Sequence, residues 1–451
     1  MMSFYDTPLA DLDVAIAADP GWALPHTMKA GFLLSLTEPA LLAEAAAHLG
    51  HARTLSAQAP ERERVHIQAL QCVLEGRWGR ACNAWDALLV DHPRDALALQ
   101  WAQLWDFYRG DLPALRQRPA RALPEWDEHD PLQPFVLGLL AFGLEENNLY
   151  PQAEEAGRRA LAANPRMPWA VHAVTHVMEM QGRFEDGAAW LRQTQPHWAE
   201  GNGFSTHLWW HKALFRLESL DIAGALRLVD SHLSGDALQI SLQRVDAASL
   251  LWRLQLLGED TARRCAALVA GWPLLQDTCT PAEDTAAVGT VAQAGYYAFN
   301  DVHAVLALLG AGEHQRAEAH VARCAARALL PEEALRTNHA MAREVGLPLM
   351  RGLLALARGD ADAAVELIYP ARAQAQRLGG SHAQRDLIDQ TLLAAAAAEG
   401  LRHTPGRRRC SGPQRHALGR ALLNERLLAK PATPLTRHWF EAVGRREAAS
   451  A

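Results

Sequence analysis

Two pairs of histidines, each pair four residues apart, are the strongest chemical signal in the sequence. His172 and His176 lie in PWAVHAVTHVMEM, and His207 and His211 lie in HLWWHKALFRLE. Four residues are about one helical turn, so each pair projects from one face of its helix. The second pair follows the first by 35 residues (207 − 172), close to one helix–turn–helix repeat. We therefore expect the pairs on facing helices about 8–10 Å apart.

Such a cluster offers ligands for a divalent metal ion. Glu179 lies seven residues after His172, two turns further along the same face. Imidazole nitrogens and a carboxylate together suit first-row metals, so His172, His176, His207 and His211 are the candidate metal ligands. HAVTH lacks the glutamate of HExxH, which excludes that type of metalloprotease. Buried histidines that bond to neighbouring helices, and a polar ligand pocket, are the alternatives.

Further polar and aromatic residues recur on apolar stretches nearby. The additional candidates for a ligand pocket are Trp169, Trp210, Asp246, Arg253, His303, His382, Arg385 and Asp386. Packing accounts for the tryptophans, and salt bridges between helices account for the charged residues. Burying such groups is costly unless they are partnered, so their convergence on one concave face would indicate a single internal polar pocket. Ser381 is the predicted N-cap of the helix that carries His382.

A repeated unit must position these residues. It consists of an apolar helical stretch, a Gly, Asn or Asp turn, and a second stretch that ends at a proline, as in GRWGRACNAWDALLVDHP from Gly76 and NLYPQAEEAGRRALAANP from Asn148. The two turns are 72 residues apart (148 − 76), or two units of 36. Further turns are predicted near Gly110, Gly182, Asp221, Gly258, Gly312 and Gly359. Helix pairs of this kind bury their apolar faces only against neighbouring pairs, as in tetratricopeptide repeats.

Composition supports the same architecture. The 451 residues exceed the usual size of one core, 49% are apolar, and no strand-like alternation of useful length is present. The net charge of −7 led us to expect no nucleic-acid partner. Six cysteines without a CxxC motif, and a start without a basic and apolar leader, favour the cytoplasm. No apolar run reaches the roughly 18 residues of a membrane span.

Several stretches resemble the tetratricopeptide repeat protein 38 family. They are PWAVHAVTHVMEMQGR, HLWWHKALFRLE, DAASLLWRLQLLG, NDVHAVLAL and GGSHAQRD, and the similarity runs over roughly residues 20–400. The resemblance implies an α-helical repeat fold and implies no particular activity.

The sequence thus predicts an all-α, tetratricopeptide-like solenoid, a right-handed superhelix of antiparallel helix pairs. Residues 1–402 would form the array, 403–413 a basic linker, and 414–451 C-terminal capping helices. The first functional hypothesis is a binding protein or scaffold whose concave groove holds a peptide, a protein segment or a small ligand. The second is an enzyme that uses the four histidines for metal-assisted or acid–base chemistry, with a divalent metal ion as its possible cofactor.

Overall fold

All regular secondary structure in the described part of the chain is helical. The computed structural model describes residues 7–276, 294–398 and 412–444, and these ranges contain no β-strand. The prediction of an all-α fold is confirmed. Within the same ranges, no helix is both long and apolar enough to cross a bilayer.

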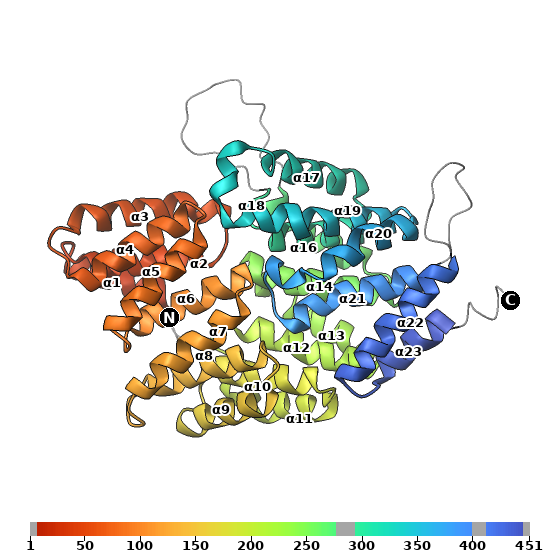
Figure 1. The fold of residues 1–451 in the computed structure, drawn as a ribbon, viewed down its shortest axis with the longest axis horizontal. Helices are drawn as coiled ribbons and strands as arrows, with labels where there is room; N and C mark the ends of the chain where they lie inside the picture. Colours follow the sequence, from red (N-terminus) through yellow and green to blue (C-terminus); the bar gives the residue numbers. More distant parts are fainter. Residues whose placement is uncertain (1–6, 277–293, 399–411, 445–451) are drawn as a thin grey trace.

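The helices pair in chain order into a tetratricopeptide-like solenoid, a right-handed superhelix (Figure 1). The first helices of the pairs are α2 (Ala23–Ser35), α4 (Glu61–Leu74), α6 (Ala96–Arg109), α8 (Gln133–Glu145), α10 (Pro168–Met180), α12 (Ser205–Glu218), α14 (Ser241–Leu256), α16 (Ala298–Gly310) and α19 (Leu347–Ala357). Their partners are α3 (Leu42–Leu55), α5 (Trp78–Asp91), α7 (Leu112–Ala122), α9 (Tyr150–Ala163), α11 (Phe184–Thr194), α13 (Ile222–His232), α15 (Ala262–Ala270), α17 (His314–Arg327) and α20 (Ala361–Arg372).

The first helix of each pair lies inside and the second outside. Helix α2 contacts α4, each first helix from α6 to α14 contacts the next first helix along the chain, and α16 contacts α19. His66 on α4 contacts Trp101 on α6 at a ring-centroid distance of 5.5 Å. Every residue of α16 is buried, whereas α17 buries only one stripe, Ala317, His320, Val321 and Cys324. An apolar sequence all round a helix requires burial on all sides, while an amphipathic one leaves a face in water.

The predicted turns lie between the paired helices. The glycines there adopt a left-handed backbone, as does Asn148, and at Asp221 the preceding Leu220 does so instead. Asp221 then caps α13 by accepting a hydrogen bond from the Gly224 amide at 2.8 Å. A left-handed residue ends one helix and reverses the chain, which explains why glycine recurs at this point.

The array closes on itself. Between α17 and α19 the chain inserts a 3₁₀ helix, α18 (Thr337–Met341) and a π turn, and α18 contacts α6. The Thr337 amide donates to the Gly76 carbonyl at 2.8 Å. Tyr297 donates its hydroxyl hydrogen to the Tyr108 carbonyl at 3.2 Å. Late repeats therefore pack on early ones, and the superhelix encloses an interior instead of an open groove.

Helix α21 (His382–Ala397) runs through that interior and contacts α10 and α14 (Figure 1). As predicted, Ser381 caps it, with its hydroxyl accepting from the Gln384 amide. Helices α22 (Gly412–Ala429) and α23 (Pro434–Gly444) follow and pack on α21, and α23 also contacts α12. The expected basic linker lies outside the described residues except for its last two, which begin α22. The division into an array, a linker and capping helices stays a prediction.

Candidate functional site

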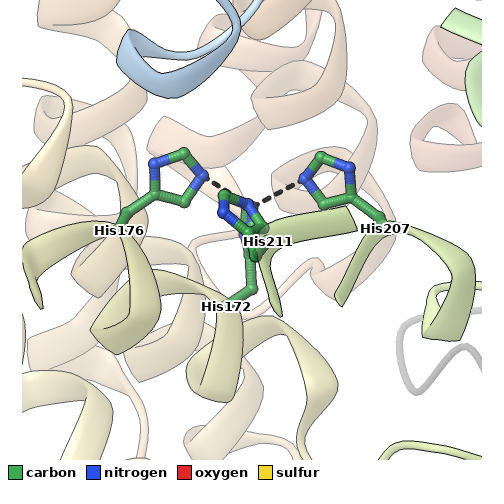
Figure 2. A group of neighbouring side chains, drawn as sticks. All are labelled: His172, His176, His207 and His211. Atoms are coloured by element: carbon green, nitrogen blue, oxygen red, sulfur yellow. Dashed lines mark hydrogen bonds between the residues drawn. The ribbon is translucent and has the colours of Figure 1, made fainter. Parts of the chain in front are cut away.

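Helices α10 and α12 bring the two histidine pairs together (Figure 2). One ring nitrogen from each of the four histidines lies within 4.8 Å of those of the other three. The Nε2 atom of His172 is 2.8 Å from Nε2 of His176 and 3.0 Å from Nε2 of His207. Side chains four residues apart share a helical face, and the 35-residue repeat turns both faces toward each other. The predicted convergence of His172, His176, His207 and His211 is present in the structure.

Carboxylates lie behind three of the four rings. Nδ1 of His207 is 2.7 Å from Oδ2 of Asp246, and Nδ1 of His211 is 3.0 Å from Oε2 of Glu179. Nδ1 of His176 faces Oε2 of Glu145 at 3.7 Å. An ionised carboxylate favours a proton on the nitrogen that faces it, which leaves the lone pair on Nε2. Metal-binding histidines are commonly oriented in this way.

The inward nitrogens lack sufficient hydrogen-bond donors. If Nδ1 carries the proton in His176 and His207, their Nε2 atoms are acceptors, and His172 can donate its Nε2 proton to only one of them. Nε2 of His211 and Nδ1 of His172 have no hydrogen-bond partner among the described residues. Leaving buried acceptors unpaired costs free energy. A cation bound among the rings would supply the missing partner.

Burial keeps the rings of His172, His176 and His211 neutral. It lowers the pKa of His172 and of His211 well below 6.5, assisted by the neighbouring histidines. Burial also lowers the pKa of His176 to about 3, although Glu146 opposes the shift. The same desolvation raises the pKa of Glu179 to about 8. Neutral imidazoles are the form that binds metals, and a bound cation would favour the ionised state of Glu179.

A cavity of about 430 Å³ begins at this cluster. His172, His207 and Asp246 form its polar wall, and Trp169 also lines it. The other walls are mainly apolar and aromatic, and they include Phe32, Leu36, Trp101, Leu104, Phe107, Phe142 and Phe204. His176 and His211 do not line the cavity and are fully buried behind it. A metal ion among the four rings would therefore adjoin the cavity on one side.

The remaining predicted residues do not share this cavity. His382, Arg385 and Asp386 on α21 line a second cavity of about 750 Å³, which is polar and charged. Gln384 on α21 and its N-cap Ser381 line the histidine-lined cavity instead. We expected one polar pocket, whereas the structure places the predicted residues that line a cavity in two separate cavities.

Three predicted residues are buried in contacts between helices. Trp210 donates to Ser249 Oγ at 3.0 Å, and its ring stacks on His207. Arg253 donates to the backbone carbonyls of Ser249 and Ala383. His303 bonds through Nδ1 to the Phe299 carbonyl at 2.8 Å. Nε of Arg253 and Nε2 of His303 are buried without a hydrogen-bond partner among the described residues. Trp210, Arg253 and His303 line neither cavity.

Sequence reasoning missed the acidic pair Glu145 and Glu146. Nδ1 of His382 lies 3.6 Å from Glu145 and 3.4 Å from Glu146, and Arg385 donates to Glu146 at 2.9 Å. Burial and the neighbouring Glu146 raise the pKa of Glu145 to about 7, whereas these two carboxylates raise the pKa of His382 to about 10 against its burial. In the sequence these two glutamates stand at the end of an apolar helix, directly before two asparagines. The same pattern is typical of a helix end that is exposed to water.

The aromatic wall was likewise only partly predicted. Trp169 was a candidate, but Phe142 and Phe204 were not, although both contact the His172 ring at centroid distances of 5.2 and 5.0 Å. Phenylalanine in a helical repeat is usually a packing residue, so composition and spacing contain no signal that separates these two.

Two comparisons describe what the chain resembles. No family model matches it. A monomeric mutant of IFIT1 with m7Gppp-AAAA superposes at a TM-score of 0.42 with 13% identity, over 98% of this chain and 96% of that one. The human IFIT1 dimer with m7Gppp-AAAA gives a TM-score of 0.40 with 14% identity, over 99% and 96% of the respective chains. Such low scores reflect a general helical layout and carry no argument about ligands of this chain.

The comparison does correct one expectation. We excluded a nucleic-acid partner because the net charge is mildly negative. That exclusion is wrong as an inference from net charge: the IFIT1 structures contain m7Gppp-AAAA, so a helical layout is compatible with a nucleic-acid ligand. A small net charge averages over the whole surface and does not exclude a nucleic-acid ligand in a helical protein.

Proposed function

We propose that the four histidines bind one transition-metal ion and that the adjoining cavity holds a small molecule on which this ion acts. One observation carries the proposal: four buried rings converge, and carboxylates stand behind three of them. A set of imidazole nitrogens suits zinc, copper, iron or nickel, whereas magnesium and calcium prefer oxygen ligands. The function is therefore that of a metal-dependent enzyme, the second of the two hypotheses drawn from the sequence.

The position of the rings supports chemistry beside the cavity. His172 and His207 line it, while His176 and His211 hold the centre from behind. Asp246, Glu179 and Glu145 keep the ring orientations and are positioning residues. A bound metal ion would supply Lewis acidity or an activated water at the cavity wall.

Cavity size argues against a peptide ligand. About 430 Å³ falls within the range of small-molecule sites, and α21 occupies the interior where a peptide would have to lie. We therefore keep the small ligand, and not the peptide, from the binding-protein hypothesis.

We also propose that the chain belongs to the tetratricopeptide repeat protein 38 family and that it is cytoplasmic. The cytoplasmic location is supported by four free thiols, those of Cys72, Cys82, Cys265 and Cys324.

Metal analysis of the purified protein tests the proposal. We expect about one zinc, iron, copper or nickel ion per chain, detected by inductively coupled plasma mass spectrometry. Cobalt(II) added to metal-free protein should give the visible absorption of a nitrogen-ligated centre. His172→Ala and His211→Ala should each abolish stoichiometric binding with the helical circular-dichroism spectrum retained. His129→Ala, at an exposed position, is the matched control.

Two results would overturn it. One is a parent protein that binds none of these metals stoichiometrically, either as purified or after anaerobic reconstitution. The other is full metal occupancy in both cluster variants, which would place the ion elsewhere.

A further inference from the structure

We infer that the histidine-lined cavity takes a small, largely apolar molecule with an aromatic or alicyclic body, one neutral polar group and no phosphate or sulfonate. Its polar group lies toward His172 and His207, and its body lies against the aromatic wall. The inference deepens the proposed function and rests on it for which end of the molecule reacts. Shape, charge and unpaired polar atoms of the cavity each support it.

The aromatic wall is continuous. Phe107 contacts Phe142 at a ring-centroid distance of 5.6 Å, Phe142 contacts Trp169 at 5.2 Å, and Trp169 contacts Phe204 at 5.3 Å. Phe204 in turn contacts His207 at 5.0 Å, so the wall leads directly to the polar end. Ring faces and edges attract other rings and apolar groups. A flat or bulky apolar body fits this surface.

The side chains of the lining offer no partner to an anionic group on the body of the ligand, away from the metal. Among the described residues no lysine or arginine lines the cavity, and its one carboxylate, Asp246, already accepts from His207 and Gln384. Burying a phosphate or sulfonate without a cationic partner costs several kcal/mol. The second cavity differs in this respect, because Arg372, Arg385 and Arg426 are among its lining residues.

Two buried atoms in the lining call for a polar group on the ligand. Gln103 donates through Nε2 to the Leu139 carbonyl at 3.0 Å, but its Oε1 has no partner among the described residues. The indole N–H of Trp101 is also without an acceptor there. Both residues line the cavity and are about 1% exposed. A hydroxyl, amide or carbonyl group on the ligand offers a partner to one such atom, whereas a purely hydrocarbon ligand offers none.

Exposure indicates where a ligand enters. Gly203 is exposed, and Phe204, Leu242 and Gln243 are half-buried, whereas His172 is buried. The mouth therefore lies between the residues before α12 and the start of α14. Phe204, at this mouth, contacts both His172 and His207 at ring-centroid distances of 5.0 Å, so the histidines lie close to the entrance.

Two fluorescent probes that differ by one sulfonate test the inference. N-phenyl-1-naphthylamine is neutral, and 8-anilino-1-naphthalenesulfonate is its anionic counterpart. In metal-free protein, we expect the neutral probe to bind one-to-one and about tenfold or more tightly than the sulfonate, because no lining side chain among the described residues offers the anion a cation. Leu104→Trp and Leu242→Trp, which fill the cavity from α6 and α14, should each weaken binding of the neutral probe at least about tenfold. Leu226→Trp, half-buried on α13 and outside the lining, is the matched control.

Metal content measured on the same samples separates this inference from the proposed function. A parent protein that binds the neutral probe as expected but holds no metal overturns the proposed function alone. A protein that binds metal as proposed, but whose metal-free form prefers the sulfonate or binds both probes equally, overturns this inference alone. Neutral-probe binding that is unchanged in both filling variants, each shown by circular dichroism to be folded, also overturns it. If a variant does not fold, the other variant and the preference of the parent protein decide.

Discussion

Nε2 of His172 lies 3.0 Å from Nε2 of His207, although 35 residues (207 − 172) separate the two in the chain. One repeat of the solenoid translates the first histidine pair onto the second, so the same geometry that builds the fold also assembles four ligands. Both rings line the cavity. A scaffold that repeats itself every 35 residues can thus place a metal-binding cluster without any insertion.

Glu179→Gln should weaken metal binding with the fold intact. Oε2 of Glu179 lies 3.0 Å from Nδ1 of His211, and an amide of the same shape lacks the charge that orients the ring and raises its basicity. Loss of such a carboxylate typically lowers metal affinity about 10- to 100-fold. Competition with a chromophoric chelator measures the change.

Glu155→Gln, exposed on α9, is the control for that experiment. An affinity of Glu179→Gln equal to that of the parent protein would show that the carboxylate does not act on the metal through His211.

Metal-free protein should lose stability on acidification below pH 6.5. Burial holds the pKa of His172 and His211 well below 6.5 and lowers the pKa of His176 to about 3 and of His303 to about 4. As the pH falls from 6.5 toward 4.5, the unfolded chain therefore takes up a proton on each of these four histidines before the folded chain does. Each such proton lowers the free energy of unfolding by about 1.4 kcal/mol per pH unit.

Two glutamates partly offset this loss. Burial raises the pKa of Glu145 to about 7 and of Glu179 to about 8, so the folded state holds two extra protons above pH 4.5. Below pH 6.5 the net proton uptake of the unfolded chain at these six groups approaches two, which predicts a fall of up to roughly 3 kcal/mol per pH unit. Urea unfolding at pH 6.5, 6.0 and 5.0 measures it. Constant or rising stability toward pH 5 would contradict the assignment of buried neutral histidines.

Gly110→Ala should destabilise the closed array by about 3 kcal/mol or more. Gly110 has a φ of 70°, and an added Cβ would lie 1.8 Å from the carbonyl oxygen of Gln376, a residue far along the chain. Gly312→Ala is the matched control, because its φ is 76° and no atom lies within 4 Å of its added Cβ. That control should cost only the backbone strain, about 1–2 kcal/mol. Equal midpoints of chemical denaturation in the two variants would argue against closure at Gly110.

Glu218→Ala should loosen the C-terminal helices. Glu218 on α12 accepts from Arg426 at 3.0 Å, from Lys430 at 3.1 Å and from Thr433 at 2.6 Å. Removing one partner of a buried ion pair costs about 3–5 kcal/mol, since a buried cation is left uncompensated. Limited proteolysis should then cleave near α22 and α23 sooner than in the parent protein.

Arg216→Ala, which removes an exposed ion pair with Asp221, should change stability by less than about 1 kcal/mol and serves as the control. Proteolysis of Glu218→Ala at the rate of the parent protein would show that the helices are held by apolar packing alone.

The helical repeat and the facing histidine pairs could be predicted because both are periodic. Turn glycines such as Gly76 and Gly182, and the spacing of His172 and His207, follow the 3.6-residue turn and the 35-residue repeat, which are properties of a short stretch of chain. Ser381 as an N-cap is local in the same sense. Regular spacing is sufficient to determine which side chains share a face and which repeats stack.

Closure of the superhelix decided the rest. The His382 amide donates to Glu146 at 2.8 Å across 236 residues of sequence, and no periodicity relates these two positions. The path of α21 separated His382, Arg385 and Asp386 from the cavity that His172 and His207 line. Phe142 and Phe204 became cavity walls because closure left space beside them. Contacts between distant segments depend on the small rotation between each pair of neighbouring repeats, added over the whole array. The sequence of a single repeat does not determine that total.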